Sequence, residues 1–187
     1  GVMALTDTFV KNVKHSGSKA GDKHTDGQGM HLLVKAAGKY WRLSYRFLGK
    51  QKTLALGVYP EVSLAQARQR RDQARKLLAE GVDPSVAKRA GKVARKLAAT
   101  AVQRDRQGGS AQAERQLLRD SGLLTLAIPQ QFGGQGLVWP ELYRIIRYLA
   151  AVDSSLAHLF AFQHLQVATI LLFGNPDQQR HWLSRTV

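Results

Sequence analysis

Hydrophobic and polar residues alternate with a period of two through most of the stretch from Tyr40 to Gly57. Such alternation predicts two paired β-strands with one buried face and one exposed face. Leu48-Gly49 lies where a two-residue hairpin turn fits, which would pair Phe47 with Lys50. The predicted core face carries Trp41, Leu43, Tyr45, Leu54 and Leu56. The opposite face is polar except for one aromatic ring and carries Tyr40, Arg42, Ser44, Arg46, Gln51 and Thr53.

The polar face of this predicted hairpin has the chemistry of a DNA-contact surface. Arg, Gln, Ser and Thr side chains bind phosphates and base edges, and a two-stranded ribbon fits the major groove of DNA. The alternative is an ordinary solvated sheet face, which is the commoner role of polar strand positions. The charge of the surrounding chain favours the first interpretation.

Shorter patterns place further elements on both sides of the hairpin. Residues 15–29 are rich in Gly, Ser, Lys, Asp and His and are predicted as loop. Residues 30–35 form a short apolar strand, so the sheet is predicted to be antiparallel and three-stranded. Ser63 and Gln66 form a capping-box pattern that begins a helix, and Gly81 marks its end. Asp83-Pro84 begins another helix.

The helix after Ser63 carries a dense set of basic residues outside its apolar stripe. Two interpretations remain open for them: solvated flanks of an amphipathic helix, or phosphate contacts beside DNA. The residues concerned are Arg68, Arg70, Arg71, Arg75 and Lys76.

Charge divides the chain into two unequal halves. The 187 residues have a formal net charge of +15, which predicts a polyanionic partner, either nucleic acid or an acidic membrane surface. Residues 1–96 hold 20 Lys and Arg against 7 Asp and Glu, whereas residues 97–187 hold 8 against 6. This asymmetry indicates two units with different roles.

The sequence contains no cysteine, which excludes disulfides and thiolate metal sites. The first residues lack the basic and apolar regions of a signal peptide, so we expect a cytoplasmic protein. The most apolar window, residues 156–173, is interrupted by polar side chains and is predicted as a buried helix that is central to its domain, without a membrane partner.

The second half of the chain has the periodicity of a helical domain. Helices are predicted for residues 111–121, 139–151 and 156–173, with a last one beginning at Asn175-Pro176. Leu123–Pro129 is predicted as an extended apolar segment. The predicted fold class is therefore an α+β N-terminal module, a three-stranded antiparallel sheet plus helices, followed by an all-α domain fragment.

Candidate catalytic or ligand-binding groups in the second half are weak. In the glycine loop Gly133–Gly136 no third glycine follows at the spacing that a nucleotide loop requires, and the βαβ setting is absent. His158 and His164 are six residues apart and fall on different faces of one helix, which does not suit a metal pair. The sequence therefore predicts no catalytic, cofactor-binding or metal-binding residue.

The first half resembles the N-terminal arm-type DNA-binding domain of phage-type tyrosine integrases. The resemblance covers residues 4–90 and is carried by D-G-Q-G-M-H-L-L-V-K, by the whole hairpin as far as V-Y-P-E-V-S-L-A-Q-A-R, and by G-V-D-P-S. It implies a sheet that enters the major groove, with Arg42, Ser44, Arg46, Gln51 and Thr53 facing the DNA. One departure is Leu48, where the family usually has Asn or Asp. The recombinase H-x-x-R pair is absent, because no histidine is followed by Arg at the third position.

The second half resembles the N-terminal helical domain of the acyl-CoA dehydrogenase superfamily, in its flavin-dependent monooxygenase branch. The motifs are L-L-R-D-S-G-L-L-T-L-A-I-P-Q-Q-F-G-G-Q-G-L, V-D-S-S-L-A-H-L and G-N-P-D-Q-Q-R-H-W-L. The family holds its flavin mainly through a β-barrel and a C-terminal domain, beyond the residues matched. The resemblance therefore implies no cofactor here, with FAD or FMN binding only if those segments were supplied.

The sequence predicts two domains, residues 1–92 and 93–187. We expect non-catalytic binding of double-stranded DNA by the first domain, with a truncated flavoenzyme-like domain attached. The alternative function is that of a fragment of a flavin-dependent oxidoreductase or monooxygenase. A third hypothesis is an interaction protein, in which another protein chain covers an exposed apolar surface of the second domain.

Overall fold

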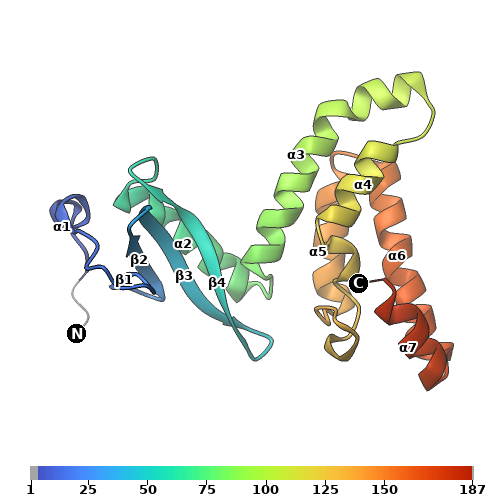
Figure 1. The fold of residues 1–187 in the computed structure, drawn as a ribbon. Coiled ribbons are helices and arrows are strands. Elements are labelled where there is room, and N and C mark those ends of the chain that lie inside the picture. The colour runs from blue at the N-terminus through green and yellow to red at the C-terminus, as the bar shows by residue number, and fades with distance from the viewer. Residues whose placement is uncertain (1–3, 187) are drawn as a thin grey trace. The chain divides into compact units, whose positions relative to one another are not determined.

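The computed structural model describes residues 4–186 and divides after Pro84 into two compact units. Figure 1 shows the course of the chain through both units. The helix that follows this division, α3 (Pro84–Gln107), runs without interruption past residue 92, where the sequence placed the domain boundary.

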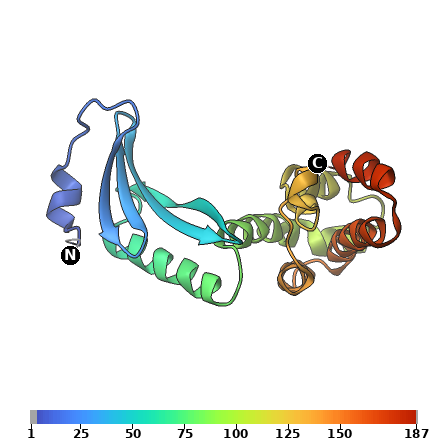
Figure 2. The same cartoon turned by 90° about the horizontal axis from the view of Figure 1, so that it is seen from below.

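The first unit is an antiparallel sheet covered on one face by a helix. Four strands lie in the order β1-β2-β3-β4, and helix α2 crosses one face of the sheet (Figure 2). The core lies between the sheet and α2, which contributes Leu64, Ala67 and Ala74. The elements are α1 (Asp7–Asn12), β1 (Asp22–Gly27), β2 (Met30–Lys35), β3 (Gly38–Phe47), β4 (Lys50–Tyr59) and α2 (Leu64–Ala79).

The sheet has four strands, so the prediction of three was wrong. Strand β1 occupies part of the segment predicted as loop, and it pairs Lys23 with Leu33 and Thr25 with His31. Its sequence, D-K-H-T-D-G, has no apolar alternation because β1 lies at the sheet edge. Strand β1 is held by backbone hydrogen bonds to β2, and these bonds do not require a periodic pattern of apolar side chains.

The hairpin prediction is confirmed in its turn and its pairing. Leu48 and Gly49 both take positive φ, at 48° and 76°, and Phe47 pairs with Lys50. The pairing continues inward until a bulge between Trp41 and Arg42 shifts the register. All five residues predicted for the core face are buried: Trp41, Leu43, Tyr45, Leu54 and Leu56.

The capping box that begins α2 is also confirmed. The backbone N–H of Gln66 donates to the Ser63 hydroxyl at 3.2 Å, and the backbone N–H of Ser63 donates to the Gln66 side chain at 3.0 Å. These two bonds satisfy donors that the first helical turn otherwise leaves without partners.

The regular elements of the second unit are all helices among its described residues, as predicted. Its core gathers Leu97, Leu118, Leu142, Leu149 and Phe160 from four helices. The segment predicted as extended, Leu123–Pro129, instead begins with a 3₁₀ turn and buries Leu123, Leu126 and Ile128. After α3 the elements are α4 (Gln112–Asp120), η1 (Leu123–Thr125), η2 (Gln130–Phe132), α5 (Trp139–Ala150), α6 (Ser154–Phe173) and α7 (Pro176–Ser184).

Helix α6 buries only one of its faces, which corrects the expectation of a central helix. Asp153 caps it by accepting from the Leu156 backbone N–H at 2.9 Å, and Phe160 and Val167 face the core. The other side leaves Leu172 and Phe173 75% and 83% exposed. By length and composition alone α6 would suffice to cross a bilayer, and 28% of its apolar window is buried within the unit.

Candidate nucleic-acid interface

The β3–β4 hairpin extends past the rest of the sheet as a two-stranded ribbon. Strand β2 pairs with β3 only as far as Leu43, whereas β3 and β4 remain paired to Phe47 and Lys50. A backbone bond of 2.9 Å from Ser44 N–H to the Gly29 carbonyl marks the base of the ribbon. A Cβ on Gly29 would lie 2.4 Å from the Ser44 carbonyl oxygen, so only glycine permits this approach.

The ribbon presents a polar face with directly paired side chains. Ser44 lies opposite Thr53, and Arg46 lies opposite Gln51 near the tip. Arg46, Gln51 and Thr53 are exposed, and Ser44 is half-buried. Cross-strand partners point to the same side of a sheet, so these four groups form one surface.

Tyr40 and Arg42 continue this surface onto the wider part of the sheet. The Arg42 guanidinium lies over the Tyr40 ring, 5.8 Å from its centroid. Arg42 is paired with His31 on one side and Ala55 on the other. The structure thus brings all six predicted residues onto the face that α2 does not cover; their contact with DNA stays a prediction.

Buried polar contacts on the opposite side fix the orientation of the ribbon. The Trp41 indole donates to the Val62 carbonyl at 2.8 Å, and the Tyr45 hydroxyl donates to Asp83 Oδ1 at 2.7 Å. The Lys52 ammonium pairs with the other Asp83 oxygen. Tyr45 and Lys52 are cross-strand partners, so both strands of the ribbon are held to one carboxylate whose side chain is fully buried.

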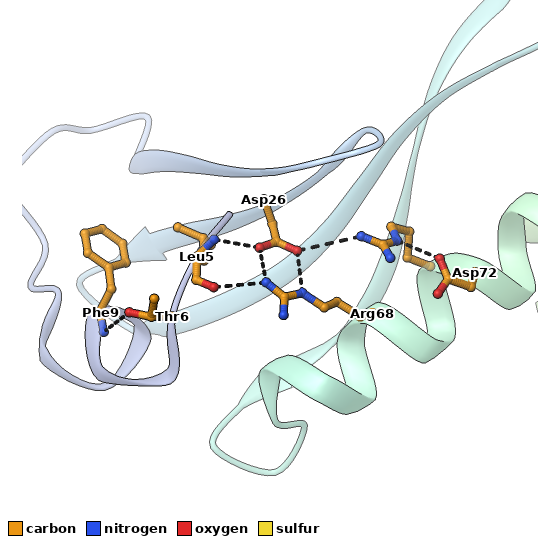
Figure 3. Close-up of polar contacts among 7 residues, drawn as sticks. Leu5, Thr6, Phe9, Asp26, Arg68 and Asp72 are labelled. Carbon is orange, nitrogen blue, oxygen red and sulfur yellow. Dashed lines mark hydrogen bonds and ion pairs between the residues drawn. The ribbon is translucent and has the colours of Figure 1, made fainter. Parts of the chain in front are cut away.

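A second carboxylate, Asp26, anchors strand β1 and the chain before α1. Arg68 binds Asp26 through two bonds of 2.9 and 2.7 Å and also donates to the Leu5 carbonyl at 2.9 Å (Figure 3). The Leu5 backbone N–H donates to Asp26 at 2.8 Å, and Arg71 lies 3.7 Å away. Burial alone would raise the pKa of Asp26, but the bonds from Arg68 and Leu5 outweigh it and lower the pKa.

These contacts settle part of the role of the basic helix. Arg68 and Arg71 bind Asp26, and Arg70 donates to the Leu56 carbonyl at 2.7 Å, so three of its five basic side chains have structural partners. Arg75 and Lys76 are exposed. Helix α2 covers the core face of the sheet (Figure 2), so its exposed residues are on the opposite side of the sheet from the polar surface.

Sequence reasoning missed Asp26 as an anchor of strand β1 because it placed this residue in a loop. The signal that was available is the G-Q-G turn at residues 27–29, where all three residues take positive φ. Such a turn between two short segments is typical of a hairpin, and it would have predicted a strand before Gly27.

The two candidate histidines of the second unit have different environments. His164 is fully buried, its ring packs edge-on against Phe160 at 4.6 Å, and neither ring nitrogen has a hydrogen-bond partner. Burial lowers the pKa of His164 to about 4, opposed by the backbone of Leu123. His158 is exposed beside the Phe162 ring. No group of three potential metal ligands occurs among residues 4–186.

Comparisons with known proteins match the chain to two families, and the two matches overlap over residues 65–91. Residues 5–91 match the family described as arm DNA-binding domain, and residues 65–187 match the acyl-CoA dehydrogenase N-terminal domain. The integrase of Enterobacteria phage P4 is 54% identical over 67 residues, which are 34% of this chain and 15% of the integrase. Dibenzothiophene monooxygenase of Rhodococcus erythropolis is 48% identical over 89 residues, which are 48% of this chain and 21% of the enzyme.

A solved structure shows the same likeness for the helical part. Methanesulfinate monooxygenase MsuC from Pseudomonas fluorescens superimposes with a TM-score of 0.51 and 48% identity, over 53% of this chain and 26% of the enzyme. The chain therefore combines an integrase-like arm DNA-binding region with part of an acyl-CoA dehydrogenase-like monooxygenase. It spans about a fifth or less of the curated relatives compared here.

Proposed function

The chain belongs to the acyl-CoA dehydrogenase family by its residues 65–187, and we propose that its biochemical activity is binding of double-stranded DNA by its arm DNA-binding region. The observation that carries this proposal is that strands β1 to β4 place no available acidic side chain on the exposed face of the sheet. Strands β1 to β4 contain two acidic residues, Asp22 and Asp26, and neither is available on that face. Ser16 binds Asp22, and Arg68 binds Asp26.

The shape of the ribbon supports the major groove as its binding site. The groove is about 12 Å wide and admits a two-stranded β-ribbon. Arg46 and Gln51 lie nearest the tip, and both side chains are suited to hydrogen bonds with base edges. Arg42 lies four residues back along β3, or about 13 Å at the usual rise of a strand, where it would meet the phosphate backbone at the edge of the groove.

The proposal is tested by DNA affinity in two variants that lose the same charge. Fluorescence anisotropy with a labelled duplex of about 30 base pairs would compare R42A/R46A with R75A/K76A, whose changes lie on α2. We expect R42A/R46A to bind at least tenfold more weakly at low salt, and R75A/K76A to bind close to the wild type. Equal losses in both variants would show that binding follows net charge alone and would contradict the assignment to the sheet.

A second candidate function follows from the 48% identity to two monooxygenases. On this hypothesis the chain supplies the helical N-terminal domain of a larger oxidoreductase. The described residues do not fit a flavin site. The buried polar side chains of the second unit are Asp153, which caps α6 and binds Arg104, and His164, which is enclosed in the core. An absorbance spectrum after incubation with FMN and gel filtration would decide, and we expect no retained flavin.

A further inference from the structure

The exposed face of the sheet extends beyond the β3–β4 hairpin to strand β1. The register places Thr25, His31, Arg42 and Ala55 in one row across all four strands. The neighbouring row contains Lys23, Leu33 and Tyr40. Lys23 and Thr25 are exposed, and they lie on the same side of the sheet as Arg42.

His31 lies between the two cations of this area and is almost covered. It is 7% exposed, and its Nδ1 is buried without a hydrogen-bond partner. Burial lowers the pKa of His31, and the charges of Lys23 and Arg42 lower it further. The positive charges of Lys23 and Arg42 therefore both act at the position of His31. Among the ion pairs of the described residues, neither Lys23 nor Arg42 is paired with an acidic group.

The spacing of the strands sets where this cluster would lie beside a bound duplex. Neighbouring strands are about 4.8 Å apart, so β1 is about 10 Å to the side of β3. A ribbon of β3 and β4 occupies the width of the major groove, about 12 Å. Strand β1 therefore falls outside the groove, at the position of a flanking sugar–phosphate strand, and a lysine side chain is long enough to reach it.

We propose that Lys23 and Arg42, on either side of His31, form a phosphate-binding zone that holds the DNA backbone beside the groove entered by the ribbon. This zone rests on the proposed function and extends it to a strand and a residue outside the hairpin. Thr25 adds a hydroxyl donor in the same row. The zone contacts the backbone, so it strengthens binding to every sequence equally, while Arg46 and Gln51 read the bases.

The salt dependence of binding by the full chain tests the zone, because each neutralised phosphate makes the slope of log K against log salt more negative by about 0.9. The comparison uses the wild type, K23A, K23R and the control K76A, a lysine exposed on α2. We expect K23A to make this slope less steep by about 0.9, and we expect the slopes of K23R and K76A to stay close to that of the wild type. Circular dichroism and thermal unfolding would confirm that all four proteins fold.

Two outcomes overturn the inference and can be told apart. An unchanged slope in K23A, together with weaker binding of R42A/R46A, would remove β1 from the interface and leave the proposed function standing. Absence of duplex binding by the wild type at low salt would contradict the proposed function and the zone with it. An equal loss of slope in K23A and K76A would assign the effect to general charge and also overturn the zone.

Discussion

The Tyr45 hydroxyl and Asp83 Oδ1 are 2.7 Å apart, and their hydrogen bond ties the inner face of the ribbon to the residue directly before helix α3. Lys52, the cross-strand partner of Tyr45, pairs with the same carboxylate. A protruding two-stranded ribbon is marginally stable alone. This buried cluster therefore holds the ribbon in the orientation that exposes Arg46 and Gln51.

Removing the Tyr45 hydroxyl should destabilise the ribbon without removing the aromatic ring from the core. We expect Tyr45→Phe to destabilise the first unit by about 1 kcal/mol, the usual net value of one buried hydrogen bond. Hydrogen exchange of the β3 and β4 amides would report the loss. Unchanged protection of these amides would contradict the role of Asp83 as an anchor.

The Asp26–Arg68 pair should make the first unit sensitive to acid. Because the folded pKa of Asp26 is lowered from 3.8, its stabilisation is present above that pH and is lost as pH falls through the folded pKa. Asp26→Asn should remove this part of the acid dependence, measured as amide protection in β1 between pH 5 and 3. An identical pH profile in the variant would contradict it.

Truncation of Arg68 should cost more stability than most surface changes. Arg68→Ala leaves a carboxylate whose side chain is 1% exposed, although Arg71 stays nearby and Arg68 itself is 35% exposed. We expect a loss of about 2 kcal/mol, below the 3–5 kcal/mol typical of a fully buried pair. Arg75→Ala, on the same helix, is the matched control and should change stability by less than about 0.5 kcal/mol.

The hairpin turn offers a stabilising substitution. Leu48 adopts a left-handed conformation at φ 48° and is 51% exposed, an arrangement that costs about 1–2 kcal/mol for a residue with a Cβ. Leu48→Asn should raise the unfolding free energy by about 0.5–1 kcal/mol because Asn-Gly is favoured in this turn. A denaturant titration that detects unfolding of the sheet would measure it, and a decrease would show that the leucine side chain stabilises the tip.

His164 should lower the stability of the helical unit in mild acid. Its folded pKa of about 4 lies below the unfolded value of 6.5, so stability is retained above 6.5 and lost as pH falls toward 4, by up to about 3 kcal/mol. His164→Leu should abolish this dependence and stabilise the unit at neutral pH, since it removes two buried nitrogens without partners. Hydrogen exchange of α6 amides in the two proteins tests both effects.

The structure follows the sequence in the hairpin and at the start of α2, where the side-chain pattern is specific. The alternation from Tyr40 to Gly57 predicted the hairpin and its core face, and the Ser63–Gln66 pattern predicted the start of α2. Strand β1 depends on backbone pairing with β2, so its polar residues carried no periodic signal. The buried pairing of Asp26 with Arg68 joins residues 42 positions apart, and no local pattern predicts such a contact.

The prediction that helix α6 is central to its domain was wrong for a different reason. Its uniform apolar composition indicated a central position, but composition cannot tell which neighbours are present to cover a face. Leu159, Phe162 and Leu165 are each about half exposed because the described residues pack against one side only. The candidate DNA surface was predictable within the hairpin, whereas Lys23 became visible only once β1 was placed in the sheet.

Amide chemical-shift mapping of the full chain during titration with duplex DNA most directly tests whether the exposed face of the sheet binds DNA. We predict the largest changes in β3 and β4 between Arg42 and Thr53 and at Lys23–Thr25, with small changes around Arg75 and Lys76 on α2. Changes that concentrate on α2, with the exposed face of the sheet unaffected, would contradict it.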